Sequence, residues 1–299
     1  MITSQHPPLL QQFRSFYFQN NFTNFEEAIE RFAIFGGISG VPDHHMPLLP
    51  LIKMHILDRY EHYHRQMTSM TLSDSIYHSL LTGIALGDGR VHSAYKRARI
   101  ASDIGDAALR YLCESGMIRQ IHSAIESVEP KLYFNVPFVR FWFAFVSPIF
   151  KGIREGDYAE FEVHYLNRKQ EFTEWVFKQL CMELIRESFK DDPIVEIGHY
   201  WNHDVEIDSI AKTRSGKTIA TTCKYTHAKI RKNELSKLQQ QCHMAHISVD
   251  TFVMVSKRGF SNEVKALKSR NLRLFSIKSF KNLVATEEEK NTIKKHNTL

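Results

Sequence analysis

Two carboxylates and a lysine stand at regular spacings in the most β-rich stretch of the chain. Glu206 and Asp208 are two residues apart in one apolar, β-branched run, and Thr222 and Lys224 are two apart in the next. Successive side chains of a strand alternate between faces, so the members of each pair share a face. If the two runs pair as a hairpin across residues 214–217, an acid and a lysine meet at one end of a sheet. These four residues are therefore the candidate catalytic residues.

This layout resembles the core of PD-(D/E)XK nucleases, in which an Asp on one strand and an acid-x-Lys on the next hold a divalent metal against a phosphate. Asp208 matches the first Asp and Lys224 the lysine, but Thr222 stands where the second acid is expected. The resemblance implies Mg²⁺ bound by Asp208. Thr222 offers only a neutral hydroxyl, so Glu206, or Glu174 from the preceding helix, would have to replace the missing acid.

The composition is that of an ordinary globular protein. With 299 residues, 43% hydrophobic and 24% charged, the chain is long enough for two or three modules with cores of their own. It has no run of 18 apolar residues and no basic region followed by an apolar core at its start, so we expect a cytoplasmic protein without membrane contact. The cysteines form no CxxC pair, which argues against disulfides and structural zinc. We expect reduced, mostly buried thiols at Cys113, Cys181, Cys223 and Cys242.

Positive charge is concentrated in the last third of the chain. Residues 212–299 contain 19 Lys and Arg against 6 Asp and Glu, whereas residues 1–211 contain 20 against 27. This asymmetry predicts a polyanionic partner, with nucleic acid, and DNA in particular, first in line. The alternative is a solvated lysine-rich surface. The expected phosphate contacts are Lys217, Lys224, Lys229, Arg231 and Lys232.

Residues 1–70 are expected to be helical and irregular. Asn24 can cap a helix over residues 25–32, which the glycines 36–37 would end. Five of the histidines in this region lie between residues 44 and 64 and suggest a metal site, but their spacings fit no standard site, and histidines on helix faces are the better account. They are His44, His45, His55, His62 and His64.

Residues 71–150 have the pattern of a winged helix-turn-helix. Capping residues and glycines predict helices over residues 74–86, 92–98 and 103–114, and short strands over 117–121 and 131–134. In a DNA-binding version the third helix would read the major groove, with Arg110 on it. Its start is acidic, however, at Asp103 and Asp106. A protein-docking or spacer module is therefore an open alternative.

The segment of residues 135–146 is dense in aromatic residues, which make up five of its twelve positions. Such a stretch must be buried against a neighbouring layer or a partner chain. A platform for stacking nucleobases is the less favoured alternative, because aromatic residues of that kind are exposed and interleaved with basic groups.

A polar break at residues 153–158 predicts a domain boundary near residue 151. A long amphipathic helix over 158–189 follows, then the hairpin, a helix over 234–246, a strand over 249–255, a helix over 262–268 and a strand over 272–277. This order predicts an α/β domain with a mixed central sheet over residues 151–285, and a flexible tail over 286–299.

The same succession of motifs resembles the region that follows the nucleotide-binding domain in archaeal-type P-loop ATPases. The C-terminal domain of that family is similar to PD-(D/E)XK nucleases and usually carries an EID…ECK signature. The resemblance covers nearly all of the chain from about residue 22. It rests on FAIFGG (32–37), FVRFWFAFVSP (138–148), IREGDY (153–158), EIGHYWNHDVEIDSIA (196–211) and the CK of residues 223–224.

The chain departs from that family in three ways. It has no GxxxxGK[ST], so we expect no ATP site and no ATP hydrolysis. The ECK of the family is Thr222-Cys223-Lys224 here. A helical acid of the family, in an FEE-like segment, falls at Phe177-Lys178-Gln179, which puts a lysine where a carboxylate would help to bind metal.

The sequence thus predicts an N-terminal helical and winged-helix module followed by a PD-(D/E)XK nuclease-like domain. The favoured function is nucleic-acid binding by a degenerate, inactive or weakly active nuclease domain, in which Asp208 and Lys224 form a residual ion pair. One alternative is a Mg²⁺-dependent DNA endonuclease. Another is an interaction partner or regulator of a separately encoded ATPase, or a protein that associates with itself.

Overall fold

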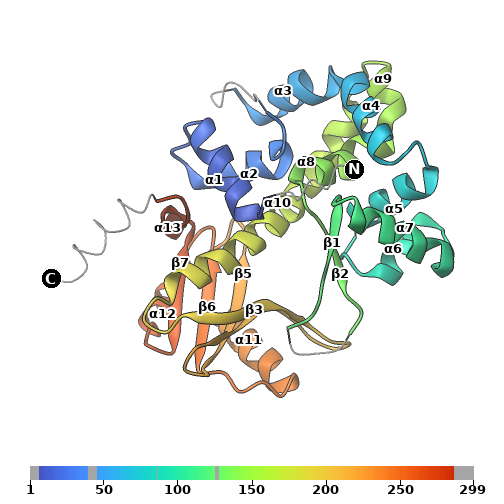
Figure 1. Ribbon diagram of the computed structural model, residues 1–299. Helices are drawn as coiled ribbons and strands as arrows, with labels where there is room; N and C mark the ends of the chain where they lie inside the picture. The colour runs from blue at the N-terminus through green and yellow to red at the C-terminus, as the bar shows by residue number, and fades with distance from the viewer. Residues whose placement is uncertain (1–6, 40–45, 86, 125–127, 286–299) are drawn as a thin grey trace. The chain divides into compact units, whose positions relative to one another are not determined.

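The computed structural model describes residues 7–39, 46–85, 87–124 and 128–285, which divide into two compact units (Figure 1). The fold class predicted from the sequence, helical and winged-helix elements followed by an α/β domain with a mixed sheet, is confirmed. The helical unit comprises Met1–Phe22, Glu30–His122 and Glu129–Phe172. The sheet unit comprises Thr23–Ile29, Ser123–Val128 and Thr173–Leu299. The sequence placed a boundary near residue 151, whereas these units divide inside a long helix.

The helical unit begins with short helices that bury aromatic side chains. They are α1 (Leu9–Gln19), the part of α2 (Phe25–Phe35) from Glu30 onward, α3 (Leu48–Ile52), the π-helical turn Lys53–Leu57 and α4 (Tyr60–Met70). The predicted cap of α2 is present, since Asn24 Oδ1 accepts the N–H of Glu26 at 2.9 Å. The ring of Phe13 packs edge-on against that of Phe32. Large buried aromatic area holds these short helices together.

The elements predicted for the winged helix are all present. They are α5 (Ser75–Ala85), α6 (Val91–Ala98), α7 (Ser102–Glu114), β1 (Ile118–Ile121) and β2 (Lys131–Phe134), with the two strands antiparallel. Helix α7 crosses α6 at Gly105, where a Cβ would lie 2.7 Å from the ring of Tyr95. Only glycine permits this close crossing. Gly116, at φ +75°, then turns the chain from α7 into β1.

The aromatic segment forms core. It folds into α8 (Pro137–Phe141), the π-helical turn η2 (Trp142–Val146), the 3₁₀ turn η3 (Ser147–Ile149) and α9 (Phe150–Arg154). The side chains of Phe141, Trp142, Phe143 and Phe145 are almost fully buried. Packing in the core is therefore confirmed over a base-stacking platform, which needs exposed rings.

Helix α10 (Ala159–Ser188) is a single helix of 30 residues, close to the predicted range. The division between the two units falls within it, at Phe172 and Thr173. Its apolar positions continue through this point without a break, with Phe172, Val176 and Leu180 all buried.

The sheet unit contains a five-stranded mixed sheet in the order β3-β4-β5-β6-β7. The strands are β3 (Ile194–Trp201), β4 (Glu206–Thr213), β5 (Thr218–Lys224), β6 (Thr251–Ser256) and β7 (Leu272–Ser276). The first three are antiparallel neighbours, and β5, β6 and β7 are parallel. The β4–β5 hairpin turns at Gly216, with φ +86°, as predicted.

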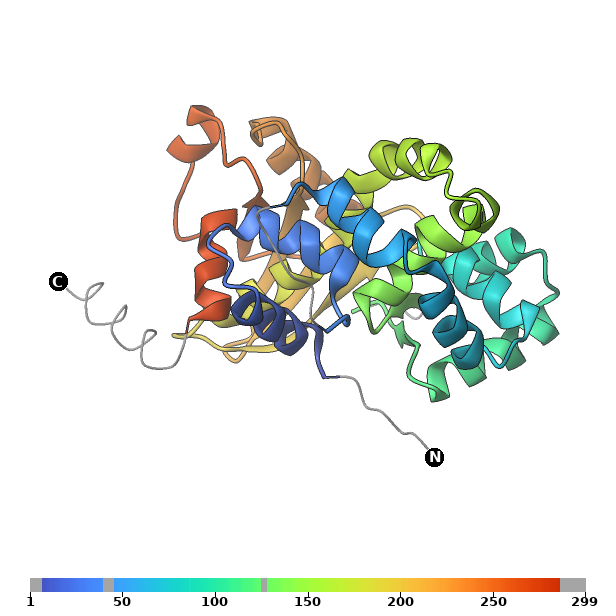
Figure 2. The same cartoon turned by 90° about the horizontal axis from the view of Figure 1, so that it is seen from above.

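Helices cover both faces of strand β5. Helix α11 (Lys232–Met244) packs Leu238 and Cys242 against Ala220. Helix α10 instead packs Phe177 against Tyr225, on the other face, since residues 220 and 225 differ by an odd number. The remaining elements are α12 (Asn262–Ala266), the 3₁₀ turn Ile277–Phe280 and α13 (Lys281–Val284). The course of the strands can be followed in Figures 1 and 2.

Several smaller expectations can be compared with the structure. His62 contacts Gln66 and His64 contacts Tyr60, each one helical turn away, and His55 is buried. His44, His45 and the tail 286–299 lie outside the described residues. Three of the four cysteines are buried, and all four are free thiols. Within the part of the chain that is described, no helix has both the length and the apolarity needed to cross a membrane.

An ion pair fastens the start of α2 inside the sheet unit. Glu26 Oε1 lies 2.8 Å from Lys257 Nζ and 3.2 Å from Arg258 Nη2. The side chain of Lys257 is only 2% exposed, and its ammonium sits 4.2 Å from the centre of the Tyr225 ring. A buried ammonium relies strongly on its carboxylate partner.

We expect Glu26→Gln to lower the free energy of unfolding by about 3 kcal/mol, because the buried charge of Lys257 loses its carboxylate. Urea unfolding measures this loss. Glu263→Gln removes an exposed carboxylate from the first turn of α12 and should change stability little. Equal stability of the two variants would show that the Glu26 pair does not stabilise the fold.

Candidate functional site

A β-bulge in β4 sets the direction of the Asp208 side chain. The register of β3 with β4 shifts there, so that His199 faces both Asp208 and Ser209. Ile207 and Ile210, on either side of the bulge, consequently pack into the same core beneath α11. The Nδ1 atom of His199 lies 2.6 Å from the main-chain oxygen of Asp208. Bulges re-aim side chains in this way, and here the bulge turns the carboxylate of Asp208 toward α10.

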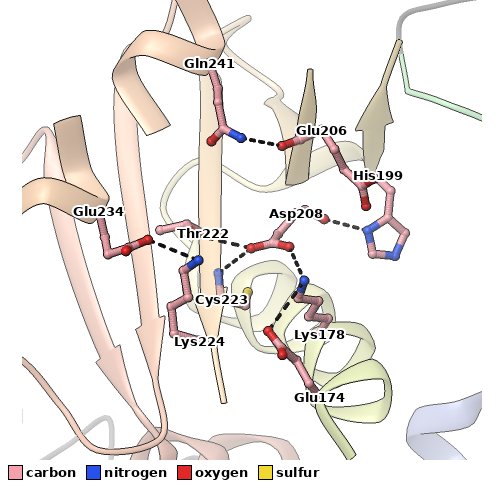
Figure 3. Close-up of polar contacts among 10 residues, drawn as sticks. All are labelled: Glu174, Lys178, His199, Glu206, Asp208, Thr222, Cys223, Lys224, Glu234 and Gln241. Atoms are coloured by element: carbon pink, nitrogen blue, oxygen red, sulfur yellow. Dashed lines mark hydrogen bonds and ion pairs between the residues drawn. The ribbon is translucent and has the colours of Figure 1, made fainter. Parts of the chain in front are cut away.

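The carboxylate of Asp208 has three partners (Figure 3). Its Oδ1 lies 2.8 Å from Lys178 Nζ on α10. Its Oδ2 accepts the main-chain N–H of Cys223 at 2.7 Å and lies 3.4 Å from the hydroxyl of Thr222. The paired residues of β4 and β5 end at Ser209 and Thr221. Beyond this pair no residue of β4 is paired with Cys223, and the carboxylate of Asp208 accepts the main-chain N–H of Cys223 instead.

The ammonium of Lys178 lies between two carboxylates. One is that of Asp208, and the other is that of Glu174, whose Oε1 is 3.6 Å away and one turn earlier on α10. The Asp208 side chain is 15% exposed and that of Lys178 is 32% exposed. This is the position that a cation would take in a site built from two acids, and a lysine of the chain itself supplies the positive charge.

The opposite charges around them keep the Lys178 ammonium and the Asp208 carboxylate ionised. Burial favours neutral Lys178, but the carboxylates of Asp208 and Glu174 outweigh burial and raise its pKa. Burial likewise favours protonated Asp208, but the ammonium of Lys178 and the N–H of Cys223 together hold its pKa below the ordinary value. Asp208 is therefore a weak base and Lys178 a weak acid at neutral pH. Neither is suited to moving a proton in catalysis.

Lys224 forms a separate ion pair. Its Nζ lies 3.1 Å from Oε2 of Glu234, in the first turn of α11. The expectation of a residual ion pair between Asp208 and Lys224 is therefore wrong. Lys224 follows the alternation of β5 and shares the α11 face with Ala220, whereas the bulge directs Asp208 to α10. The two charges still influence each other, because Lys224 contributes to the lowered pKa of Asp208.

The other two candidate catalytic residues take different positions. Thr222 lies beside Asp208, as its place in the strand predicts. Glu206 has an exposed side chain, and its main-chain oxygen accepts from Nε2 of Gln241 at 2.8 Å. Of the two acids considered as replacements, Glu174 is the one that contacts Lys178.

A divalent metal does not fit this arrangement. Mg²⁺ needs an octahedral shell of oxygen ligands, usually including one or two carboxylates. The ammonium of Lys178 stands between the carboxylates of Asp208 and Glu174. Across the described residues, no group of three or more His, Cys, Asp or Glu side chains could hold a metal ion. The described residues around Asp208 thus do not fit a bound Mg²⁺ ion.

The predicted phosphate contacts divide into two groups. Lys217 precedes β5, whereas Lys229, Arg231 and Lys232 follow Lys224 at the other end of that strand. A strand of seven residues spans roughly 20 Å, so Lys217 lies far from the rest.

The loop that follows β5 runs beside the loop that follows β6. The N–H of Ile230 bonds to the oxygen of Gly259 at 3.0 Å, and the N–H of Ser261 bonds to the oxygen of Ile230 at 2.9 Å. Lys229, Arg231 and Lys232 are exposed there. Exposed basic groups therefore gather at the carboxyl end of the parallel strands.

Arg110 lies in the helical unit, on the exposed face of α7. The same face carries Asp103, Asp106 and Glu114, and the exposed side chain of Ile104. Asp106 also accepts the hydroxyl of Tyr95 at 2.7 Å. The exposed face of α7 is thus acidic on balance.

Sequence reasoning did not identify Glu234 as part of the site. Its only sequence signal is an acid in the first turn of the helix that follows Lys224, and such acids usually stabilise helix starts. The bulge at Asp208 had no sequence signal.

A family described as archaeal and bacterial proteins of unknown function (DUF234) has a model that matches residues 142–238. The matched segment contains Lys178, Asp208, Lys224 and Glu234, and so covers the whole candidate site. It also includes the EID and CK motifs, and it begins at Trp142, inside the aromatic FWF block. No curated protein and no solved structure matches the chain. The match links this segment to a family and assigns it no activity.

We expect Lys178→Met to lower the free energy of unfolding by about 2 kcal/mol at pH 7, because Asp208 keeps a carboxylate without its ammonium. In the wild type the depressed pKa of Asp208 stabilises the fold above about pH 4, and this contribution is lost as pH falls through the folded pKa. In the variant the pKa of Asp208 should rise, so that its carboxyl group is largely protonated at pH 4 and no longer needs the ammonium. The difference in free energy of unfolding between variant and wild type should therefore be smaller at pH 4 than at pH 7. Urea unfolding at both pH values measures the difference.

Lys169→Met, at an exposed position of the same helix, is the matched control and should show neither effect. A deficit of the Lys178 variant that is equal at pH 4 and pH 7 would contradict the electrostatic account.

We expect Lys178→Glu to create affinity for a divalent cation, because three carboxylates would replace two carboxylates and an ammonium. The variant should be destabilised without metal and should gain several degrees of Tm in 5 mM Mn²⁺, with no comparable gain for the wild type or for Lys169→Glu. Thermal unfolding with and without Mn²⁺ measures this. Stabilisation of the wild type by Mn²⁺ to the same degree would show that Lys178 does not exclude the metal.

Proposed function

We propose that the sheet unit is a nucleic-acid-binding module, built on a nuclease-like core that does not cleave its ligand. The observation that carries the proposal is the position of the Lys178 ammonium, between the carboxylates of Asp208 and Glu174. This charge replacement supports loss of metal-dependent hydrolysis. The basic loops at the carboxyl end of the parallel strands support retention of phosphate binding.

The nuclease-like character is supported by topology as well as by sequence. An antiparallel β3-β4-β5 meander continues into the parallel strands β6 and β7, with helices on both faces of β5. Asp208 and Lys224 lie on the neighbouring strands β4 and β5, in the positions of the motif that the chain resembles. This agreement supports the fold assignment, and the activity must be argued from the site.

Hydrolysis by such a core requires a metal-bound water, and the charges at the site work against it. A cation approaching Asp208 would have to displace or repel the ammonium of Lys178. Asp208 has a lowered pKa and cannot replace the metal as a base that activates water. Lys224 is occupied by Glu234. The endonuclease alternative is therefore disfavoured.

Phosphate binding is supported by exposed basic groups where ligands of open α/β sheets usually bind, at the carboxyl ends of the strands. Lys229 and Arg231 are exposed in the loop after β5, and Lys232 is exposed at the first position of α11. Arg258 lies in the neighbouring loop, where it is also paired with Glu26. Each contact with a phosphate releases counterions, so affinity should fall steeply as salt rises. We assign these groups, rather than Lys217, the main contact with the nucleic acid.

The winged-helix elements fit a second role, contact with a protein. The exposed face of α7 carries Asp103, Asp106 and Glu114 against the single charge of Arg110. A phosphate backbone would be repelled by such a face, whereas the exposed side chain of Ile104, in the first turn of α7, suits a protein surface. A partner protein such as a separately encoded ATPase, or a second copy of the chain, would then bind through this module.

We expect the triple variant Lys229→Ala, Arg231→Ala, Lys232→Ala to bind a 30-base-pair DNA at least tenfold more weakly at 50 mM salt. The slope of log affinity against log salt should become shallower by about 2–3, as expected for losing three phosphate contacts. Fluorescence anisotropy across a salt series measures both values.

The matched control is Lys212→Ala, Arg214→Ala, Lys217→Ala, which removes the same charge from the opposite end of the sheet. Equal weakening by both triple variants would mean that net charge alone attracts DNA. Plasmid incubated with Mg²⁺ or Mn²⁺ should remain intact. Nicking by the wild type that Asp208→Ala abolishes would establish the endonuclease alternative instead.

A further inference from the structure

A separate cavity, wide open to solvent, lies at the surface of the helical unit. Its volume is about 680 Å³, which is in the range of small-molecule sites. Helices α5 and α6, the turn η3, the start of α9 and the first half of α10 form its walls. The lining residues are His78, Ser79, Thr82, Gly83, Arg97, Ala98, Ser147, Pro148, Phe150 and Arg168.

Two glycines position one of its cationic groups. A Cβ at Gly83 would lie 2.8 Å from the main-chain oxygen of Ala94, so α6 can cross α5 closely only because residue 83 is glycine. A Cβ at Gly87 would lie 2.2 Å from Nη1 of Arg97. The absence of both side chains leaves room for the guanidinium of Arg97 beside the cavity.

The charge of the cavity favours an anion. Arg97 and Arg168 both line it, and none of the described residues that line it is acidic. Arg168 also contacts Glu171, at 3.3 Å, in an exposed pair one turn along α10. Exposed pairs of this kind contribute little stability, so they can yield to a ligand. Guanidinium groups bind phosphate oxygens with paired hydrogen bonds.

Hydroxyl and imidazole groups supply further polar contacts. The Nε2 of His78 is hydrogen-bonded to the hydroxyl of Ser147, across the cavity wall from α5 to η3. Burial lowers the pKa of His78, so the imidazole is neutral at pH 7. Ser79, next to His78, and Thr82, one turn later on α5, add hydroxyl groups. The hydroxyl of Thr82 donates to the main-chain oxygen of His78 at 3.0 Å and can accept from a ligand.

An apolar wall completes the cavity. Phe150 is 39% exposed, although most aromatic residues of the preceding segment are buried, and Pro148 lies two residues before it. An exposed ring beside cationic groups suits a ligand with a flat, apolar part attached to an anion.

We propose that this cavity binds a small organic phosphate of mononucleotide size. The phosphate contacts Arg97 and Arg168, the hydroxyl groups of α5 and η3 bind its polar edges, and the planar base lies against Phe150. Neither the resemblance to ATPases nor the family match assigns a site to these residues. The site is independent of the nucleic-acid binding proposed for the sheet unit.

Isothermal titration of the full chain with AMP, CMP, GMP and UMP tests the proposal. We expect at least one to bind with a Kd below 1 mM, and inorganic phosphate or the corresponding nucleoside to bind at least tenfold more weakly. Arg97→Ala with Arg168→Ala should weaken the nucleotide at least tenfold, and Phe150→Ala should weaken it while leaving inorganic phosphate unaffected.

Arg99→Ala is the control, since it removes an exposed arginine just after α6 that does not line the cavity. Circular dichroism of each variant verifies folding, and Arg97→Lys replaces the double variant if that one unfolds. Absence of binding by all four nucleotides would overturn the proposal. Binding that the sheet-unit triple variant abolishes and the Arg97 and Arg168 variants do not would also overturn it, by placing the nucleotide on the sheet unit.

Discussion

A carboxylate removed from water needs a positive charge beside it, and the site follows from how Asp208 meets this requirement. The PD-(D/E)XK nucleases, whose core this chain resembles, use a divalent cation. In this chain Lys178 supplies the charge from one helical turn beyond Glu174, 2.8 Å from Asp208. The ammonium is tethered to a packed helix, so no free ion has to be captured from solution. The same residue that stabilises the acid therefore removes the reason for binding metal.

The bulge at Asp208 and Ser209 makes this solution possible and explains where sequence reasoning stopped. Strict alternation placed Asp208 with Glu206 and led to the expectation of an ion pair with Lys224. The extra residue opposite His199 instead directs Asp208 to α10, while Lys224 pairs with Glu234. The bulge depends on how β4 is registered against β3, a partner strand that ends several residues before β4 begins. Nothing in the local sequence of β4 specifies that register.

Local signals predicted the elements well because they act within a few residues. The cap at Asn24, the turn at Gly216, the long apolar period of α10 and the glycine after α7 each correspond to an observed feature. The division into two compact units has no local sequence signal of this kind. The polar break at 153–158 resembled a boundary, whereas the two compact units divide inside α10, where the apolar pattern is continuous. A helix shared by two units leaves no mark in composition.

Charge counts alone overstate how many basic groups can reach a ligand. Of the lysines in the basic third, Lys224 is held by Glu234 and Lys257 by Glu26, with its side chain almost fully buried. A phosphate would have to displace a carboxylate to reach either of them. For the exposed side chains of Lys229 and Arg231, in the loop after β5, no carboxylate partner is found among the residues that the structure describes. The phosphate binding that we propose is therefore best assigned to loops beside the nuclease-like residues, and those residues themselves to stabilising the sheet unit.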